Sequence, residues 1–309
     1  MREAGNILIF HAGALGDFVL TWPLAMAISH LYPESRIVYV THATKGQLAH
    51  RFLPVDYVCI DTGGWYSMHG DWLKLSDENR ALLAGAERVF AFASRPDECF
   101  GRNCRHVGDM EVTELRALPE GGAKRHVAAF YVEQLRAQPD LARTLAKVLR
   151  TLLLQGLVPA PRGSATRVLV HPGSGSARKC WPAERFVELI GALRAQGHDV
   201  AVLLGEVELE RWPREQVEAF LPVLTPATHC DLAEELLKCR LLITNDNGPG
   251  HLSAILGTPT LCLFGPTDPT VWRPLGPSVT VLHPPTLDAL GVDEVMEAAR
   301  QCLVEVPVA

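Results

Sequence analysis

The sequence predicts an α/β protein made of two doubly wound, Rossmann-like domains that face a cleft. Short continuous apolar runs alternate with helix-like stretches along the chain, which indicates parallel strands covered on both faces. The pattern starts again at Arg167 after a Pro-, Gly- and Ser-rich segment over residues 158–165, as expected of a linker. A length of 309 residues fits two domains of ordinary size. We therefore expect an N-terminal domain over residues 1–160 and a C-terminal domain over residues 161–309, whose last helix could pack back on the first domain.

The first half contains four predicted strands and one long helix. A strand over residues 7–10 runs into the Gly-rich segment 11–17, and the apolar spacing of residues 18–31 predicts a helix that ends before Pro33. Further apolar runs predict strands over residues 36–41, 57–60 and 88–93. Residues 63–109 form the least regular part of this half, and we interpret them either as a loop lining an acceptor site or as a covering loop.

The second half repeats the same signals in the order expected of a second sheet. The predicted strands cover residues 167–171, 199–204, 241–244 and 260–264, and the predicted helices cover residues 183–196, 207–220, 231–238, 250–256 and 287–301. Gly197 and Gly257 follow two of these helices as stop signals. Ligands of open parallel sheets sit beyond the carboxyl ends of the strands, so we expect the site in the cleft between the domains, on residues that directly follow strands.

Composition and charge narrow the function classes. Hydrophobic residues make up 48% and charged residues 21%, which is typical of a folded chain. The 29 Lys and Arg against 35 Asp and Glu give a net charge of −6, which argues against nucleic acid as a partner. No apolar run reaches the length of a membrane span, and residues 1–10 lead into a strand rather than forming a signal peptide. We therefore expect a cytoplasmic protein with at most transient contact at the inner face of the membrane.

The eight cysteines show no spacing typical of a disulfide framework, which predicts free and mostly buried thiols. Cys99, Cys104 and His106 are close in sequence, but their spacing is not that of a common zinc motif. We interpret them as ordinary loop residues and expect no metal site.

The first candidate motif follows the first predicted strand. Its glycines, Gly13 and Gly16, allow a tight turn close to a ligand, although the spacing is not the dinucleotide fingerprint. Asp17 stands where the helix begins. It is either the N-cap of that helix or a carboxylate that acts as general base at the cleft, and the pattern by itself favours the cap.

The second candidate motif is the polar loop over residues 172–182, which precedes a helix. The hydroxyl of Ser174 or Ser176 and the ammonium of Lys179 would suit a phosphate at this position. The spacing is not that of a Walker A loop. The alternative is a solvated loop whose lysine points to water.

The third candidate motif covers residues 244–251, again between a strand and a helix. Turn residues at a helix N-terminus present free N–H groups to an anion. Asp246 would bind sugar hydroxyls or cap the helix, and His251 is either structural or a donor to a phosphate. Glu208 follows another strand as a ribose contact or as an exposed first-turn carboxylate, and the loop over residues 264–269 is a smaller element of the same kind.

Together these segments resemble glycosyltransferase family 9, the heptosyltransferases that transfer ADP-activated heptose to the lipopolysaccharide inner core. The resemblance spans nearly the whole chain, and its segments are weak singly but specific in this order. They are Gly13 to Asp17 with Pro23, Lys179 to Pro182, Glu208, residues 245–251 and residues 264–267. His126 and Tyr131 also resemble the start of the family's helix before the interdomain linker.

The resemblance implies the GT-B architecture, an inverting mechanism, no cofactor and no essential metal. The N-terminal domain is then the acceptor-binding domain and the C-terminal domain binds the nucleotide-sugar donor. Asp17 is implied to be the catalytic base on an acceptor hydroxyl, with Gly13 and Gly16 in the acceptor-side loop.

On the donor side, the resemblance implies that Lys179 contacts the diphosphate, that Glu208 contacts the ribose and that Asp246 lies near the donor sugar. The phosphate-binding turn is matched by Asn247, Gly248 and His251, and Ser174 joins the donor-binding set through its place in the second motif.

The chain departs from the family pattern at three places, which bear on the substrate more than on the reaction class. Residues 11–12 stand where a basic residue is usual, Asn247 replaces the commoner Ser or Thr, and residues 205–207 differ from a Gly-Gly-Pro pattern.

The sequence therefore predicts a metal-independent, inverting transfer of a sugar, heptose from ADP-heptose, to a lipopolysaccharide-core or related glycan acceptor. The partners expected are a nucleotide-sugar donor and a glycan or lipid-linked acceptor. The alternatives are a sugar-nucleotide epimerase or phosphorylase on the same fold, and a non-catalytic homologue that binds sugar nucleotides.

Overall fold

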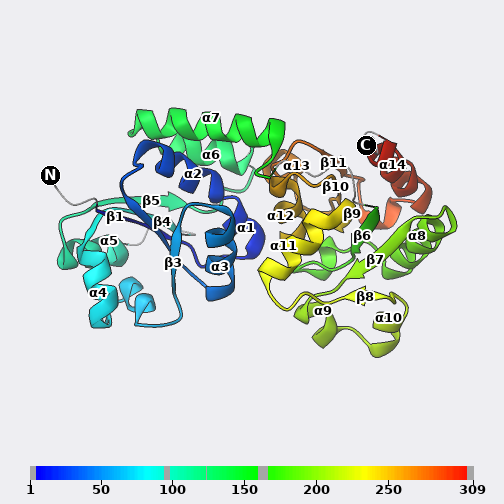
Figure 1. Cartoon of the computed structure of the whole chain (residues 1–309), viewed down its shortest axis with the longest axis horizontal. Coiled ribbons are helices and arrows are strands. Elements are labelled where there is room, and N and C mark those ends of the chain that lie inside the picture. The colour runs from blue at the N-terminus through cyan, green and yellow to red at the C-terminus, as the bar shows by residue number, and fades with distance from the viewer. Residues whose placement is uncertain (1–4, 94–97, 123, 159–165, 305–309) are drawn as a thin grey trace. The chain divides into compact units, whose positions relative to one another are not determined.

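The computed structural model describes residues 5–93, 98–122, 124–158 and 166–304 (Figure 1). The chain divides into two compact units, Met1–Leu149 and Arg150–Ala309. This division falls inside helix α7 (Pro139–Gln155), upstream of the expected boundary, and residues 159–165 of the expected linker lie outside the described residues. Each unit has its own parallel sheet with helices around it, so the predicted fold class is confirmed.

The first unit contains a five-stranded parallel sheet in the order β3-β2-β1-β4-β5. Its strands are β1 (Asn6–Phe10), β2 (Arg36–Thr41), β3 (Asp56–Cys59), β4 (Ala86–Ala93) and β5 (Glu111–Arg116). The central strand β1 pairs with β2 and β4, and its residues Ile7, Leu8 and Ile9 are fully buried. The strand order reverses direction between β1 and β4, which is where open α/β sheets bind ligands. The loop after β1 therefore leaves the sheet at the position that the topology favours for a site.

The helices of the first unit differ from expectation near the first motif. They are α1 (Leu15–Val19), α2 (Trp22–Leu31), α3 (Ala43–Phe52), α4 (Asp77–Ala84), α5 (Glu98–Val107), α6 (Val127–Gln134) and α7, with the 3-10 turn η1 (Trp65–His69). The helix expected over residues 18–31 starts earlier and is split at Thr21. The Thr21 hydroxyl donates to the Phe18 carbonyl at 2.7 Å, and Pro23 lacks the N–H that would continue the helix, which explains the break.

The interpretation of residues 63–109 as a loop is wrong. This stretch contains all of η1, α4, β4 and α5. Helix α4 begins at a side-chain N-cap, Ser76, which accepts the N–H of the third helical residue. Trp65 and Phe100 pack edge-on against Phe10 at ring-centroid distances of 5.2 and 5.0 Å, so a few large side chains bury the stretch without a long apolar period.

The second unit contains a six-stranded parallel sheet in the order β11-β10-β9-β6-β7-β8. Its strands are β6 (Arg167–His171), β7 (Asp199–Leu203), β8 (Val223–Leu224), β9 (Cys239–Asn245), β10 (Thr260–Leu263) and β11 (Val279–Leu282). The central pair β6 and β9 ends in register, with His171 opposite Thr244. The loops that follow these two strands therefore start side by side, although they are far apart in sequence.

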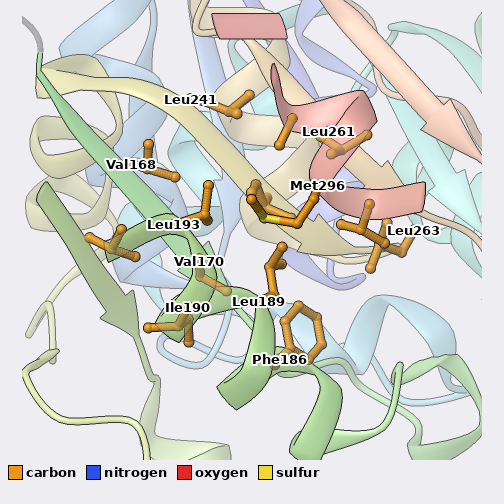
Figure 2. Close-up of a cluster of buried hydrophobic side chains, with 14 of the residues drawn as sticks. Val168, Val170, Phe186, Leu189, Ile190, Leu193, Leu241, Leu261, Leu263 and Met296 are labelled. Atoms are coloured by element: carbon orange, nitrogen blue, oxygen red, sulfur yellow. The ribbon is translucent and has the colours of Figure 1, made fainter. Parts of the chain in front are cut away.

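Helices cover both faces of the second sheet, with α8 and α14 on one face and α11 and α12 on the other (Figure 1). The bounds are α8 (Ala183–Ala195), α9 (Glu206–Arg211), α10 (Arg214–Glu218), α11 (His229–Lys238), α12 (Gly248–Leu256), α13 (Pro269–Trp272) and α14 (Val292–Val304), with the 3-10 turns η2 (Ala177–Lys179) and η3 (Leu287–Ala289). Figure 2 shows Phe186, Leu189 and Met296 among the core side chains, together with Val170 and Leu263. The last helix, α14, buries its apolar face in this core, where it packs against α8.

The prediction of a single helix over residues 207–220 is also wrong. Helix α9 ends at Arg211, and α10 begins only after Pro213, whose ring cannot continue a helix. The strands that the sequence did not predict, β5, β8 and β11, are one edge strand of the first sheet and the two edge strands of the second.

The segment directly after α7 is fastened to the end of α12. The Leu157 N–H donates to the Ile255 carbonyl at 2.7 Å. Gly156 and Gly257 have φ values of +70° and +95°, and a Cβ on Gly156 would lie 2.6 Å from the Gly257 Cα. This approach therefore requires glycine at both positions.

Within the described ranges, no helix combines the length and apolar character that crossing a membrane demands. The same ranges contain no group of three or more His, Cys, Asp or Glu side chains placed to hold a metal ion. All eight cysteines are free thiols, as expected, and Cys99, Cys104 and His106 lie on α5 rather than in a loop.

Candidate functional site

The second unit gathers four polar side chains around Asp246, whose carboxylate is buried. Asp246 follows β9, and its side chain is only 5% exposed. Its Oδ2 accepts hydrogen bonds from Lys179 Nζ at 2.7 Å and from Thr267 Oγ1 at 2.6 Å. His251 Nε2, on the first turns of α12, lies 4.0 Å from Asp246 Oδ1. Ser174 Oγ donates to the Asp246 backbone carbonyl at 2.9 Å, so the loops after β6, β9 and β10 meet at this residue.

The ion pair is asymmetric in exposure. The Lys179 side chain is 31% exposed, whereas Asp246 is buried. An ammonium has three donors, and Asp246 occupies one of them, so Lys179 keeps donor capacity towards solvent or a ligand. The alternative of a lysine that merely points to water is wrong, because its ammonium is held at the loop junction. Thr267 was part of the motif pattern, but its role as a partner of Asp246 was not predicted.

Asn247 caps α12 rather than presenting its side chain outwards. Its Oδ1 accepts the Gly250 N–H at 3.0 Å, and its Nδ2 donates to the Gly173 carbonyl at 2.7 Å. Gly248 is the first residue of the nine-residue helix α12. At this position backbone N–H groups lack partners within the helix, and the helix dipole attracts anions. Asn247 therefore both starts the helix and ties it to the loop after β6.

A fully buried amide that the sequence analysis did not select, Asn245, locks the same loops together. Its Nδ2 donates to the Pro172 carbonyl at 2.7 Å, and its Oδ1 accepts the Trp181 N–H at 3.0 Å. The signal available in the sequence was an amide at the carboxyl end of a strand, beside Asp246. Its contacts fix the course of the polar loop on both sides of Lys179.

Glu208 lies on α9 and is buried, with 6% exposure, so the alternative of an exposed first-turn carboxylate is wrong. Its Oε2 accepts the Gly205 N–H at 2.9 Å, which caps the helix start. Its other oxygen lies close under the loop after β6, because a Cβ on Gly173 would be only 2.0 Å from Oε1. Burial lowers the pKa of the neighbouring His171, and the Glu208 charge opposes that shift.

A pocket of about 440 Å³ opens between the loop after β6 and helices α9 and α10. Its lining includes Ser174, Glu208, Arg211, Trp212 and Gln216. This volume is in the range of small-molecule sites and admits a nucleoside-sized ligand. The last three of these residues were missed because the sequence was interpreted there as one continuous helix.

In the first unit, Asp17 lies in the first turn of α1, and its side chain is half-buried. The N-cap position belongs to Ala14, which has no side-chain capping bond, so the interpretation of Asp17 as N-cap is wrong. Gly16 is the second residue of the helix. Gly13 lies in the preceding turn, where a Cβ would approach the His11 Cε1 to 2.9 Å.

Lys45, on the first turn of α3, is a residue of this edge that the sequence analysis missed. It is 6% exposed, and its Nζ donates to the Gly13 carbonyl. Burial lowers the pKa of Lys45, and the carboxylates of Asp61 and Asp17 oppose this shift. The signal in the sequence was a lysine shortly after the second strand, in a stretch without a recognised motif.

A second polar group surrounds the turn before α1. His42 Nε2 is 3.2 Å from the Ala12 carbonyl, and its Nδ1 is 2.9 Å from Asp61 Oδ2. Tyr66 OH donates to Asp61 Oδ1 at 3.1 Å. The hydrogen bond from His42, with that from Tyr66, holds the pKa of Asp61 below its usual range. His11 is buried, and burial, Lys45 and His42 lower its pKa to about 3, so it is neutral at physiological pH.

The two remaining motif residues of this unit support the fold. His126 is the N-cap of α6 and accepts the Ala128 N–H at 3.1 Å. Tyr131 is buried, and its hydroxyl donates to the Ala117 carbonyl at 2.9 Å. The predicted residues thus gather at the carboxyl edge of each sheet: Gly13, Gly16 and Asp17 at the first, and Ser174, Lys179, Glu208, Asp246, Asn247, Gly248 and His251 at the second.

The sequence model described as glycosyltransferase family 9 (heptosyltransferase) matches residues 127–290, more than half of the chain. Lipooligosaccharide heptosyltransferase 2 of Haemophilus influenzae is 31% identical over 122 residues, 36% of this chain and 35% of that protein. Lipopolysaccharide heptosyltransferase 3 of Escherichia coli is 30% identical over 113 residues, 35% of this chain and 33% of that protein. The matched part thus spans about a third of the length of these curated relatives.

Solved structures match over almost the whole chain at low identity. A glycosyl transferase family 9 protein from Veillonella parvula has a TM-score of 0.73 and 21% identity, covering 99% of both chains. E. coli heptosyltransferase WaaC with ADP has a TM-score of 0.66 and 18% identity, covering 96% of this chain and 99% of that one. A putative UDP-N-acetylglucosamine 2-epimerase from Listeria monocytogenes has a TM-score of 0.53 and 12% identity, covering 98% and 89%. At these identities the likeness shows the fold, which is the GT-B fold of the heptosyltransferases.

Proposed function

The chain belongs to glycosyltransferase family 9 (heptosyltransferase), and on that premise we propose that it transfers heptose from ADP-heptose to a lipopolysaccharide-core or related glycan acceptor. The observation that carries the proposal is the junction at Asp246. There a partly exposed ammonium, Lys179, is held at the end of the sheet where α12 also begins. A cation and a helix N-terminus together suit the diphosphate of a nucleotide sugar.

We assign the nucleoside to the pocket beside this junction. The pocket is lined by Glu208, whose Oε2 is bound to the Gly205 N–H, and by Ser174. A carboxylate accepts hydrogen bonds from two vicinal hydroxyls, as a ribose presents them. ADP is the nucleotide in the solved WaaC relative, and we propose the same base for this chain.

We assign the acceptor to the carboxyl edge of the first sheet, with Asp17 as general base. The acceptor oxygen loses its proton to the Asp17 carboxylate and forms a bond to the anomeric carbon of the donor sugar. The bond from that carbon to the diphosphate breaks on the opposite face, so the configuration inverts. The electron pair and the negative charge leave with the diphosphate, where Lys179, His251 and the start of α12 stabilise them.

This assignment gives protein groups the electrostatic task that a divalent metal has in other glycosyl transfers, so we propose that the reaction is metal-independent. An undiminished rate in the presence of a chelator is the expected result. A rate that the chelator abolishes and added magnesium restores would contradict it.

The test is transfer with ADP-heptose and a panel of heptose-deficient lipopolysaccharide-core acceptors, with products identified by mass. An acceptor-dependent increase of one heptose supports the proposal. Isomerised donor without an acceptor supports an epimerase, and a sugar phosphate formed with inorganic phosphate supports a phosphorylase. ADP binding without turnover of any acceptor supports a non-catalytic homologue.

A matched pair of variants ties the assay to the site. Lys179→Met removes the ammonium bound to Asp246, whereas Arg178→Met removes an exposed cation from the same 3-10 turn. We expect the first to weaken ADP binding by roughly 10-fold to 100-fold, the range of a charged hydrogen bond, and the second to leave it unchanged. Equal affinities in both variants would remove Lys179 from the donor site.

A further inference from the structure

Lys45 is a buried cation of the first unit that the proposed mechanism leaves without a task. Helix α3 begins directly after β2, and the Lys45 ammonium reaches from it to the Gly13 carbonyl, in the turn that precedes α1. A buried ammonium requires compensating charge. Gly13, whose carbonyl Lys45 binds, lies beside Asp17, because a Cβ on Gly13 would be 3.6 Å from the Asp17 Cβ. Burial lowers the pKa of Lys45, and the carboxylates of Asp61 and Asp17 oppose this shift.

We propose that Lys45 is a positioning residue for catalysis, which fixes the turn at Gly13 and keeps the Asp17 carboxylate ionised. This inference rests on the proposed function, because it gives Asp17 the role of base. The electrostatic interaction is mutual: a carboxylate that stabilises the charged lysine is itself stabilised in its charged form by that lysine. An ionised carboxylate is ready to accept the acceptor proton, whereas a protonated one is not.

Four further titratable groups lie around the turn before α1. They are His11 at the end of β1, His42 at the N-cap of α3, Asp61 after β3 and Tyr131 on α6. His11 is neutral at physiological pH, because burial, Lys45 and His42 lower its pKa to about 3. Burial raises the pKa of Tyr131, so this hydroxyl is neutral as well. His42 is bonded to the Asp61 carboxylate, which compensates any charge that the imidazole carries.

The first experiment observes the Asp17 carboxyl without any substrate. The protein is labelled with carbon-13 at its aspartate carboxyls, and Asp17→Asn identifies the resonance by its loss. Lys45→Met keeps the unbranched stem without the charge, Lys45→Gln keeps an N–H donor for the Gly13 carbonyl, and Lys45→Arg keeps the charge. Lys124→Met, at an exposed lysine of the same unit, is the matched control.

We expect the titration midpoint of Asp17 to rise by about one pH unit or more in Lys45→Met and Lys45→Gln. It should stay near the parent value in Lys45→Arg and in the control. Melting midpoints of all variants show whether each is folded, and the Gln variant decides the question if Lys45→Met is not. An unchanged Asp17 midpoint in the folded neutral variants would overturn the inference.

The second experiment is kinetic and separates two roles of Lys45. With ADP-heptose and the acceptor identified by the transfer assay, the acid limb of kcat/KM against pH should move upward in Lys45→Met by the same amount. A higher KM for the acceptor with an unmoved acid limb would overturn the inference and make Lys45 an acceptor contact. If the parent transfers to no acceptor, the proposed function fails, while the carboxyl titration still decides whether Lys45 ionises Asp17.

Discussion

The two sheet edges each combine a lysine with an acid, but they bury opposite partners. At the second edge Asp246 is buried and Lys179 is partly exposed. At the first edge Lys45 is buried, and Asp17 is the partly exposed group. At the second edge the buried charge holds the accessible one, and we propose that Lys45 does the same for Asp17 at the first edge. The comparison teaches that the accessible member indicates the chemistry: an exposed cation suits an anionic ligand, and an exposed carboxylate suits a proton.

The two lysines also differ in the acceptor that each one binds. Lys179 donates to a carboxylate, so its position depends on a charge 67 residues away in the sequence. Lys45 donates to a backbone carbonyl, so its position depends on the shape of a turn. A substitution of the acid should therefore disturb the loops of the second edge more than those of the first.

The largest expected effect tests whether Asp17, at the first edge, is the general base. Asp17→Asn keeps the shape of the side chain but cannot take a proton. We expect turnover at saturating donor and acceptor to fall by roughly 10²–10⁴-fold, with ADP affinity and the melting midpoint close to those of the parent. Turnover within a few-fold of the parent would break the comparison, because the accessible carboxylate would then have no chemical role.

The next effect concerns the buried acid of the second edge. Asp246→Ala leaves Lys179 and Thr267 without their shared acceptor, and we expect the free energy of unfolding to fall by about 2 to 3 kcal/mol. Asp199→Ala removes the acid of an exposed ion pair in the same unit and should cost less than about 1 kcal/mol. Denaturant unfolding measures both, and equal losses would mean that burial does not distinguish the two pairs.

The buried His11 at the first edge makes the free energy of unfolding depend on pH. The pKa of His11 falls from 6.5 in the unfolded chain to about 3 in the folded one, so below pH 6.5 the unfolded state binds the additional proton. Stability is therefore lost as the pH falls, by about 2 kcal/mol between pH 7 and pH 5. His11→Gln should remove this part of the slope when unfolding free energies are compared at the two pH values. Parallel slopes for parent and variant would show that His11 is not the buried neutral group described.

The smallest effect tests the contact between the loop after β6 and Glu208. A Cβ on Gly173 would lie 2.0 Å from Glu208 Oε1, whereas a Cβ on Gly175 meets nothing within 4 Å. Gly173→Ala should displace the carboxylate and weaken ADP binding by about fivefold to tenfold, the value of one hydrogen bond. Gly175→Ala should bind ADP like the parent in calorimetric titration. Equal affinity in both would place the nucleotide away from Glu208.

Much of the fold could be predicted because buried parallel strands are continuous apolar runs. The stops at Gly197 and Gly257 were also readable, since each glycine has a positive φ after a helix. The breaks at Thr21 and Pro213 were missed because apolar spacing continues through them. The edge strands β5, β8 and β11 were missed because each has at most one buried residue, whereas the edge strand β3, which has none, was predicted from its apolar run.

The candidate site was predictable where chemistry and topology coincide. Lys179, Asp246 and Glu208 all follow strands, so their gathering at one edge follows from the parallel sheet. Lys45 could not be predicted, because its partner at Gly13 belongs to another strand–helix unit and its stretch has no motif. Asn245 was passed over because a buried amide that serves only backbone groups looks the same in sequence as one that faces a ligand.

The junction of Gly156 with Gly257 gives α12 a mechanical role. The helix offers its amino end to the proposed diphosphate, and its other end is clamped to the residues that follow α7. The nine residues of α12 form a rigid helix about 14 Å long. The helix therefore keeps its anion end at a fixed distance from the point where the chain leaves α7.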